Sequence, residues 1–178
     1  MEDIRIYCEN TRSYVKVMMG TTLSELSGQL CPTINDNMQV LAALVDNKLK
    51  SLDYKIINPH NVRFVGYDHP DGRRTYIRSL CFVLQKVIRD IYPDKVLSID
   101  YSLPSGLYCE IREAEPMEDG RPRVYFVTDE ELQSIEDKMR EIIAADMPFC
   151  KKMMSLGECE TLFTRNGQTE KVNLIKTI

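Results

Sequence analysis

Residues 76–84 read Tyr-Ile-Arg-Ser-Leu-Cys-Phe-Val-Leu and begin the longest helix that this sequence predicts. One apolar stripe at three- and four-residue spacing runs through it, formed by Ile77, Leu80, Cys81, Leu84, Val87, Ile88 and Ile91. Pro93 ends the helix, because proline lacks a backbone donor and clashes with the preceding turn. The polar, turn-rich residues 66–72 precede the helix, so we place a domain boundary there.

The residues before this boundary predict a small sheet covered by one helix. The expected elements are strands at 4–7 and 14–17, a helix from Thr21 or Thr22 to Leu30 with Glu25 in its first turn, a strand at 41–45, a tight turn at Asp46-Asn47 followed by 48–50, and a strand at 62–65. Strand, strand, helix and further strands is an α+β order. The helix must cover one face of the sheet, since neither element buries its apolar side alone.

The residues after the long helix predict a second α+β part. The expected elements are strands at 96–101 and 107–111 joined through 103–106, a mobile charged loop from Glu113 to Arg123 with Pro116 and Gly120, a helix opened by a Thr128–Glu131 capping box with Leu132, Ile135, Met139 and Ile142 inward, a stop at Pro148, a strand at 149–154, a second capping box at Ser155–Glu158, a left-handed turn at Asn166-Gly167 and a strand at 171–175. Ile178 closes no element, so we expect a segment of a longer protein.

Composition sets limits on the function. The 178 residues carry a net charge of −4, so no global basic field draws the chain onto nucleic acid, and no DNA partner is expected. No apolar run is long enough to span a bilayer, and the N-terminus has no signal-peptide pattern. The six cysteines form no CxxC pair, which favours reduced, mostly buried thiols in a cytoplasmic protein, without a metal site.

Two motifs in the first part carry a resemblance. Gly20-Thr21-Thr22-Leu23-Ser24-Glu25-Leu26 is similar to the helix entry of TGS domains, and residues 43–49, Ala-Leu-Val-Asp-Asn-Lys-Leu, resemble the hairpin of the same family. Residues 1–66 therefore resemble a TGS domain, which implies a β-grasp, ubiquitin-like fold.

The second part resembles the editing region of threonyl-tRNA synthetase, also called its second additional domain. The matching segments are Ile77-Arg78 with the Cys81 helix, residues 107–111, residues 127–132, residues 136–139 and residues 163–172. Residues 67–178 are thus expected to form an α+β editing-like domain that is truncated at its C-terminal end. Lys171 matches a lysine that lines the editing pocket of the family.

This chain departs from the family where the family's chemistry lies. The resemblance implies a histidine at each of two positions four residues apart, which share one helix face. Here these positions hold Ser79 and Val83; valine cannot take a proton, and serine without a base is inert. We therefore expect a degenerate pocket with no catalytic residue and no metal. Its candidate residues are Arg78, Ser79, Val83, Tyr108 and Lys171.

The same pair of domains also precedes the kinase domain of bacterial proteins similar to uridine kinase, where the histidine pair is generally missing. The favoured hypothesis is therefore a non-catalytic regulatory or ligand-binding module of such a nucleoside kinase, a transferase. Its partners would be its own C-terminal kinase domain, which would use ATP and Mg beyond Ile178, and a nucleoside, nucleotide or tRNA. The first alternative is an editing deacylase of mischarged tRNA, and the second is a structural interaction domain.

Several residues keep two interpretations. Cys81 is either a nucleophile or, as the stripe favours, a core residue. Lys171 holds a phosphate or ribose, or is a solvated lysine at a strand edge. Arg78 binds an anion or forms a surface ion pair. His60 and His69 are read as turn residues, and Lys151-Lys152 as a charged strand face rather than an RNA contact.

Overall fold

A computed structural model describes residues 2–34, 38–104, 106–115 and 117–177. The chain forms two compact units, Met1–Arg140 and Glu141–Ile178. The boundary after residue 66 lies inside the first unit and stays a prediction. Three residues that entered the expectations, Ser105, Pro116 and Ile178, lie outside the described residues.

The first unit begins with a mixed five-stranded sheet whose order is β2-β1-β7-β5-β6. The strands are β1 (Asp3–Cys8), β2 (Ser13–Met18), β5 (Ala42–Val45), β6 (Lys48–Lys50) and β7 (Asn61–Val65), and a short pair, β3 (Thr33–Ile34) and β4 (Met38–Gln39), stands apart. β1 pairs antiparallel with β2 and parallel with β7, and β5 pairs antiparallel with β6 and β7. The predicted β-grasp arrangement and the α+β class are confirmed.

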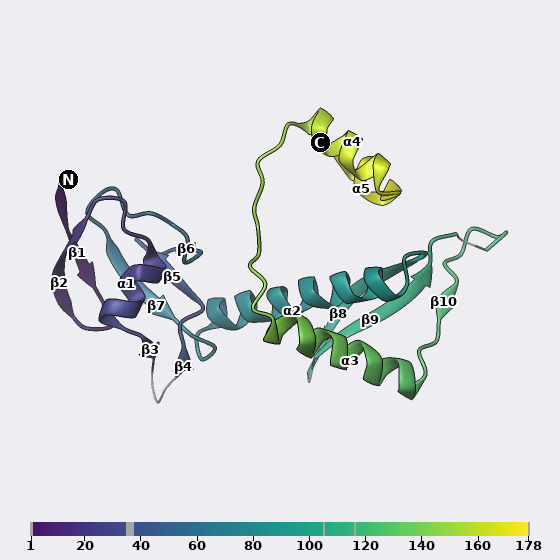
Figure 1. The fold of residues 1–178 in the computed structure, drawn as a ribbon, viewed down its shortest axis with the longest axis horizontal. Helices are drawn as coiled ribbons and strands as arrows, with labels where there is room; N and C mark the ends of the chain where they lie inside the picture. The colour runs from purple at the N-terminus through teal and green to yellow at the C-terminus, as the bar shows by residue number, and fades with distance from the viewer. Residues whose placement is uncertain (1, 35–37, 105, 116, 178) are drawn as a thin grey trace. The chain divides into compact units, whose positions relative to one another are not determined.

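Helix α1 (Leu23–Leu30) lies against this sheet (Figure 1). Thr22 caps the helix in the predicted capping box with Glu25. Leu23 and Leu26 are fully buried and enter the core of the sheet. This core is formed by Ile6, Cys8, Val17, Leu23, Leu26, Ile34, Val40, Ala43, Val45, Ile56, Val62 and Phe64.

The side chain of Asn10 extends the ladder between β1 and β7. The backbone N–H of Glu9 donates to the carbonyl of Val62, and the chain then turns away from β7. Beyond this point, Asn10 Nδ2 donates to the carbonyl of Phe64 at 3.1 Å, and the N–H of Phe64 donates to Asn10 Oδ1 at 2.7 Å. An amide side chain therefore satisfies the backbone groups that a continued strand would have paired.

Helix α2 (Pro70–Ile91) starts earlier than the sequence indicated, inside the predicted boundary stretch. His69 is its N-cap and Pro70 its first residue. The N–H of His69 donates to the carbonyl of Gly66, so His69 closes a turn, as expected, and also caps the helix. The first turn packs tightly against the end of β7. A Cβ on Gly72 would lie 1.8 Å from the carbonyl oxygen of Gly66, so this approach requires glycine.

A three-stranded antiparallel sheet, β10-β9-β8, follows α2. Its strands are β8 (Lys95–Leu103), β9 (Gly106–Glu113) and β10 (Val124–Tyr125), and β10 was not predicted. Helices α2 and α3 (Asp129–Ala144) lie along this sheet (Figure 1). The buried side chains of this part are Val83, Val87, Ile88, Ile111 and Ile135. A β-bulge between Ile99 and Tyr101 interrupts the register of β8 against β9.

Glu131 holds the start of α3 to the elements around it. Its Oε2 accepts from the backbone N–H of Thr128 at 2.9 Å, as the predicted capping box requires. Its Oε1 accepts from the hydroxyls of Tyr92 and Tyr125. These bonds, that to the Thr128 backbone first, lower the pKa of Glu131 to about 2. Burial and the bond to Glu131 raise the pKa of Tyr92 to about 12.

Lys95 completes this cluster from β8. Its side chain is only 10% exposed, and Nζ lies 3.2 Å from Glu113 Oε2 and 3.3 Å from Asp94 Oδ2. The same ammonium lies 4.6 Å from the ring centroid of Tyr125, a favourable cation–π distance. The cluster therefore joins α2, β8, β9, β10 and α3 by polar contacts as well as by apolar burial.

The second unit contains a helical pair, α4 (Leu156–Arg165) and α5 (Thr169–Lys176). Ser155 and Glu158 form the predicted capping box, and Gly167 takes the predicted left-handed conformation with φ +67°. Val172 is buried, and Lys176 Nζ lies 3.2 Å from Glu160 Oε1. The strand predicted at 171–175 was wrong, because these residues belong to α5.

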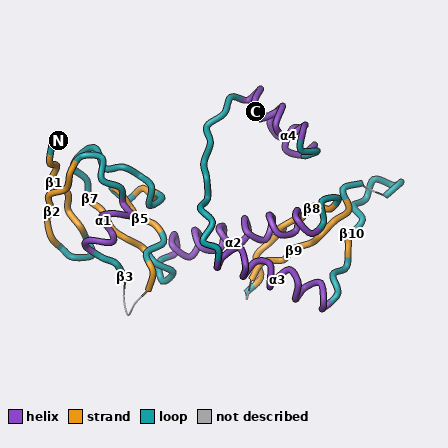
Figure 2. The backbone as a smooth tube through the Cα atoms, viewed as in Figure 1, coloured by secondary structure: helices purple, strands orange, loops and turns teal. Residues whose placement is uncertain are grey.

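Three further predictions on the C-terminal side were wrong. Residues 149–154 form no strand and run as a loop (Figure 2). The helix before them ends at Ala144, four residues before Pro148, and Asp146 takes a positive φ of 47°. Leu132 was expected inward but is 59% exposed, whereas Ile135 is buried as expected.

The six cysteines carry no disulfide, but they are less buried than predicted. Only Cys8 is buried; Cys31, Cys81 and Cys159 are partly buried, and Cys109 and Cys150 are exposed. Burial raises the thiol pKa of Cys31 and of Cys109. Within the described part of the chain, no helix combines the length and apolar character needed to cross a membrane.

Candidate functional site

Helix α2 positions three of the five candidate residues. Ser79 and Val83 lie one turn apart on one face, and Val83 is only 8% exposed. Ser79 is partly buried, and its hydroxyl donates to the carbonyl of Thr75 at 3.0 Å. Arg78 is exposed. The two histidine positions are therefore occupied by a serine hydroxyl that is bonded within the helix and by a buried isopropyl group.

Both histidines of the chain have structural partners away from Ser79 and Val83. His60 Nδ1 lies 2.6 Å from Asp46 Oδ2, between the loop before β7 and the turn after β5. His69 Nδ1 accepts the backbone N–H of Asp71 at the start of α2. Neither imidazole belongs to the helical turns that carry Ser79 and Val83. A serine hydroxyl needs a neighbouring base to become a nucleophile, and histidine supplies none on these turns.

Tyr108 projects from β9 onto the face opposite α2. Successive side chains of a strand point to opposite faces. Tyr108 and Glu110 therefore lie on one face of β9, and Ile111 and Glu113 lie on the other. Ile111 is buried, and Glu113 pairs with Lys95 beside the ring of Tyr92 at the end of α2. The structure therefore does not bring Tyr108 to the face that holds Val83.

On its own face, Tyr108 stacks against Tyr101 of β8. Their ring centroids lie 4.8 Å apart with an interplanar angle of 9°, and Tyr101 remains 55% exposed. The Tyr108 hydroxyl donates to Glu110 Oε1 at 2.8 Å, which raises the pKa of Tyr108. The result is an aromatic platform of two parallel rings, one of them largely open to solvent.

Charged side chains border the tyrosine pair. Arg112 Nη2 lies 2.9 Å from Asp100 Oδ2 and 2.8 Å from Glu110 Oε2. The bonds from Tyr108 and then Arg112 lower the pKa of Glu110. Tyr101, Asp100 and Arg112 were not among the predicted site residues. The two-residue spacing of Tyr108, Glu110 and Arg112 was a usable signal for a shared polar face.

Lys171 belongs to the second unit, on α5. Its side chain is exposed, and its Nζ lies 5.4 Å from the ring centroid of Phe163 on α4. The expectation of a lysine at a strand edge fails, because the segment is helical. No set of three or more His, Cys, Asp or Glu side chains suited to a metal ion occurs within the described ranges.

Comparisons with known proteins place this geometry in context. No protein-family model matches the chain. Over 168 residues it is 27% identical to a threonine–tRNA ligase of Rhodopseudomonas palustris, which covers 94% of this chain and 23% of the ligase. A threonine–tRNA ligase of Clostridium kluyveri is 26% identical over 175 residues, covering 98% of this chain and 25% of the ligase.

The similarity extends along the whole chain. With a threonine–tRNA ligase of Acidithiobacillus ferrooxidans it is 25% identical over 178 residues, which is 100% of this chain and 25% of the ligase. The chain thus spans about a quarter of the length of these curated relatives. This coverage fits the resemblance to the TGS and editing regions of threonyl-tRNA synthetases.

Proposed function

We propose that this chain is a threonine–tRNA ligase-like module that binds the single-stranded 3′ end of a tRNA without hydrolysing its ester. The observation that carries the proposal is the similarity to threonine–tRNA ligases over nearly every residue of the chain. tRNA is the macromolecule that the names of these relatives share, and the open tyrosine platform is a feature that suits an unpaired base.

The platform supports base stacking. Base–aromatic stacking contributes about 1–3 kcal/mol per base and tolerates any sequence. The ring of Tyr101 is the more exposed of the pair, and the ring of Tyr108 stacks parallel against one of its faces. Arg112 is already paired with two carboxylates, so it orients the platform rather than contributing a free positive charge.

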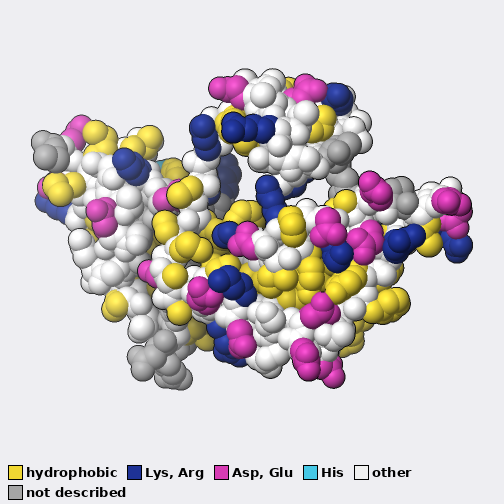
Figure 3. Space-filling model, turned by 45° about the vertical axis from the view of Figure 1, so that its right-hand side comes forward, with side chains coloured by type: hydrophobic (Ala, Val, Ile, Leu, Met, Phe, Trp, Pro, Cys, Tyr) yellow, Lys and Arg dark blue, Asp and Glu magenta, His cyan; other side chains and the backbone are white. Residues whose placement is uncertain are grey.

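Charge supports a local contact over a long-range attraction. The net charge is −4, and on the face shown in Figure 3 Lys and Arg side chains are interspersed with Asp and Glu. The dependence of affinity on salt scales with the number of phosphates neutralised. The affinity of a module that binds by stacking is therefore expected to depend only weakly on the salt concentration.

The helix supports the non-hydrolytic part of the proposal. Ester hydrolysis needs an activated water or nucleophile and a group that moves a proton. The Ser79 hydroxyl is bonded to the Thr75 carbonyl, and Val83 offers no polar atom. The competing function, an editing deacylase, would have to draw its base from outside these positions.

A binding experiment tests the first part. Fluorescence anisotropy of threonine tRNA, with and without its unpaired 3′ nucleotides, should show affinity that is lost on removing them. Tyr101→Ser should weaken binding about tenfold, the loss of one stacked base. Tyr14→Ser is the matched control, because Tyr14 is also exposed and also contacts a second tyrosine, Tyr7. Equal losses in both variants, or binding that ignores the 3′ end, would contradict the proposal.

A hydrolysis experiment separates the two functions. Serine differs from threonine by one methyl group, a difference that binding alone separates only by about 10- to 200-fold. Threonine tRNA charged with serine is therefore the informative substrate. We expect its ester to survive in the presence of the chain as long as it does in buffer. Accelerated release of serine that purifies with the chain would establish the deacylase instead.

The nucleoside-kinase context is a second candidate, favoured by Ser79 and Val83 at the two histidine positions. In that context the chain would regulate a kinase domain that uses ATP and Mg, with a nucleoside or nucleotide as its ligand. The sequence of the gene around the codons for residues 1–178 decides between the two. A P-loop motif, GxxxxGK[ST], supports the kinase context, and the catalytic motifs of a tRNA ligase exclude it.

A further inference from the structure

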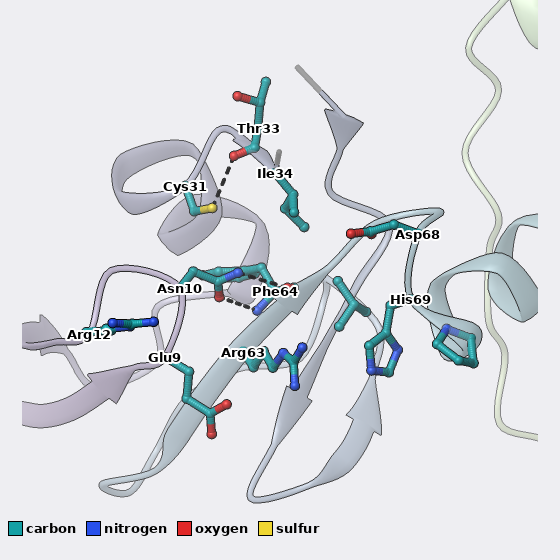
Figure 4. A pocket seen from close by; sticks show the side chains of 12 residues that line it. Glu9, Asn10, Arg12, Cys31, Thr33, Ile34, Arg63, Phe64, Asp68 and His69 are labelled. Carbon is teal, nitrogen blue, oxygen red and sulfur yellow. Dashed lines mark hydrogen bonds between the residues drawn. The ribbon is translucent and has the colours of Figure 1, made fainter. Parts of the chain in front are cut away.

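The β-grasp part of the first unit carries an open pocket of about 650 Å³ that no sequence motif indicated. Figure 4 shows its lining. The turn between β1 and β2 contributes Glu9 and Arg12, β7 contributes Arg63, and the start of α2 contributes His69. The pocket is separate from Ser79, Val83 and the tyrosine platform, so it does not depend on the proposed function.

The pocket contains two cationic side chains without an ion-pair partner in the part of the chain that the structure describes. Arg12 and Arg63 are both exposed, and neither forms an ion pair with a carboxylate among the described residues. Elsewhere in the first unit, Arg74, Arg112 and Arg121 each lie within 3.2 Å of a carboxylate oxygen. Guanidinium groups without an ion-pair partner favour the binding of an anion.

The backbone holds these groups in place. Arg12 has a left-handed φ of 52°, which fixes the turn that carries it. The two bonds between Asn10 and Phe64 tie this turn to β7, directly beside Arg63. The backbone that carries both arginines is therefore in place before a ligand arrives, which lowers the entropic cost of binding.

The start of α2 adds the imidazole of His69 and the positive end of the helix dipole to the same pocket. Because Nδ1 of His69 accepts the N–H of Asp71, the proton of its neutral ring is on Nε2, which is left to donate. Helix α2 is 22 residues long, and the positive end of its dipole lies at Pro70, which also lines the pocket. Two arginines, an imidazole N–H and a helix N-terminus together match the chemistry of a phosphate group.

The carboxylates of the lining restrict the ligand further. Glu9 and Asp68 also line the pocket, and a bare polyanion would be repelled by both. Carboxylates accept hydrogen bonds from hydroxyl groups. We propose that this pocket binds a phosphate monoester of a polyol, with Arg12, Arg63 and His69 holding the phosphate and Glu9 accepting from the hydroxyls.

The test uses the whole 178-residue chain and four probes: ribose 5-phosphate, inorganic phosphate, ribose and sulfate. Backbone NMR shifts report the place of binding, and calorimetry reports the affinity. Ribose 5-phosphate should shift the signals of Asn10, Arg12, Arg63 and His69 and bind more tightly than the other three probes. Ribose alone should leave these signals unmoved.

Substitutions test which side chains bind the phosphate and which bind the hydroxyl groups. The double variant Arg12→Asn, Arg63→Gln should weaken ribose 5-phosphate by about tenfold or more, because charge-assisted bonds are lost. Asparagine tolerates the left-handed φ of position 12, so this variant keeps the turn. Lys16→Gln removes an exposed charge from the neighbouring strand β2 and should leave affinity unchanged. Glu9→Gln should reduce the preference for the ester over inorganic phosphate.

Three results would overturn the proposal. The first is the absence of shifts at these residues with millimolar ribose 5-phosphate. The second is unchanged affinity in the double variant while its thermal unfolding matches that of the parent chain. The third is equal binding of ribose 5-phosphate, inorganic phosphate and sulfate, which would show a general anion site with no contact to the polyol.

Discussion

The hydroxyl of Tyr92 donates to Glu131 Oε1 at 2.9 Å and so joins the end of α2 to the first turn of α3. The same carboxylate accepts from the N–H of Thr128, which it caps. A single acidic side chain thus serves both as a helix cap and as a tertiary contact. Substitutions at Glu131 should therefore disturb more than the local helix.

Glu131→Ala should lower the urea midpoint of the chain clearly more than Glu130→Ala. The first change leaves the N–H of Thr128 and two tyrosine hydroxyls without their acceptor. The second removes an exposed charge from the same helical turn. Urea unfolding followed by circular dichroism measures both. Similar midpoints for the two variants would show that the cluster adds nothing beyond helix charge.

The acid stability of the chain should depend on Glu131. Its folded-state pKa of about 2 lies below the ordinary value of 4.5. A group with a depressed pKa stabilises the fold above its unfolded-state pKa and loses this contribution as the pH falls through its folded-state pKa. The stability advantage of the parent chain over Glu131→Gln should therefore shrink between about pH 5 and about pH 2. Urea midpoints of both proteins at these two pH values test this, and a constant difference would contradict it.

Asn10→Ala should destabilise the β-grasp part by about 1–3 kcal/mol, because both backbone groups of Phe64 lose their partner. Thr11→Ala, in the same turn, removes only an exposed bond to Ser13 and serves as the control. Asn10→Asp keeps the acceptor for the Phe64 N–H and should fall between the two. Chemical unfolding gives the order, and a harmless Asn10→Ala would refute the ladder role.

Gly72→Ala and Gly28→Ala should shift stability in opposite directions. A Cβ at residue 72 would lie 1.8 Å from the Gly66 oxygen, so we expect a loss of about 3 kcal/mol or more. A Cβ at residue 28, inside α1, meets nothing within 4 Å, so this change should stabilise by about 0.5–1 kcal/mol. Thermal unfolding separates the two signs. A tolerated Gly72→Ala would mean that α2 shifts away from β7 at little cost.

Val83→His should cost about 1–3 kcal/mol, because it places a polar ring in a buried position. Ser79→His, one turn earlier and partly exposed, should cost clearly less. The comparison asks whether residue 83 faces a core or a cavity. If both histidines are tolerated equally, space for an imidazole exists beside Val83, and an open editing-type pocket regains support.

The sequence predicted most elements of the first unit because their signals are local and strong. Thr22 and Glu25 are the two residue types that form a capping box, at the required spacing of three. Polar and apolar residues alternate within both strands of the β1–β2 hairpin. The early start of α2 was missed because His69 is an unusual N-cap and because Gly72 was read as a turn signal. Residue 72 must be glycine because the helix contacts Gly66 there, and no local sequence pattern reveals this tertiary contact.

The failures on the C-terminal side have a shared physical cause. Residues 149–154 alternate partly, as a strand does, but a strand exists only where another strand pairs with it. Residues 171–175, Lys-Val-Asn-Leu-Ile, are a short segment with three apolar side chains, and periodicity over so few residues does not distinguish strand from helix. Tyr108 and Val83 were linked only by family resemblance, whereas the alternation of β9 turns Tyr108 away from the face that packs on α2.

The bulge between Ile99 and Tyr101 has a consequence for the protein at high concentration. Strand β8 is an outer strand of its sheet, and Ile99, Tyr101 and Leu103 are all exposed. A straight apolar edge of this kind would template the strand of a neighbouring molecule and nucleate fibres. The misaligned backbone at Asp100, with its charged side chain, breaks the row of donors and acceptors that such growth would need.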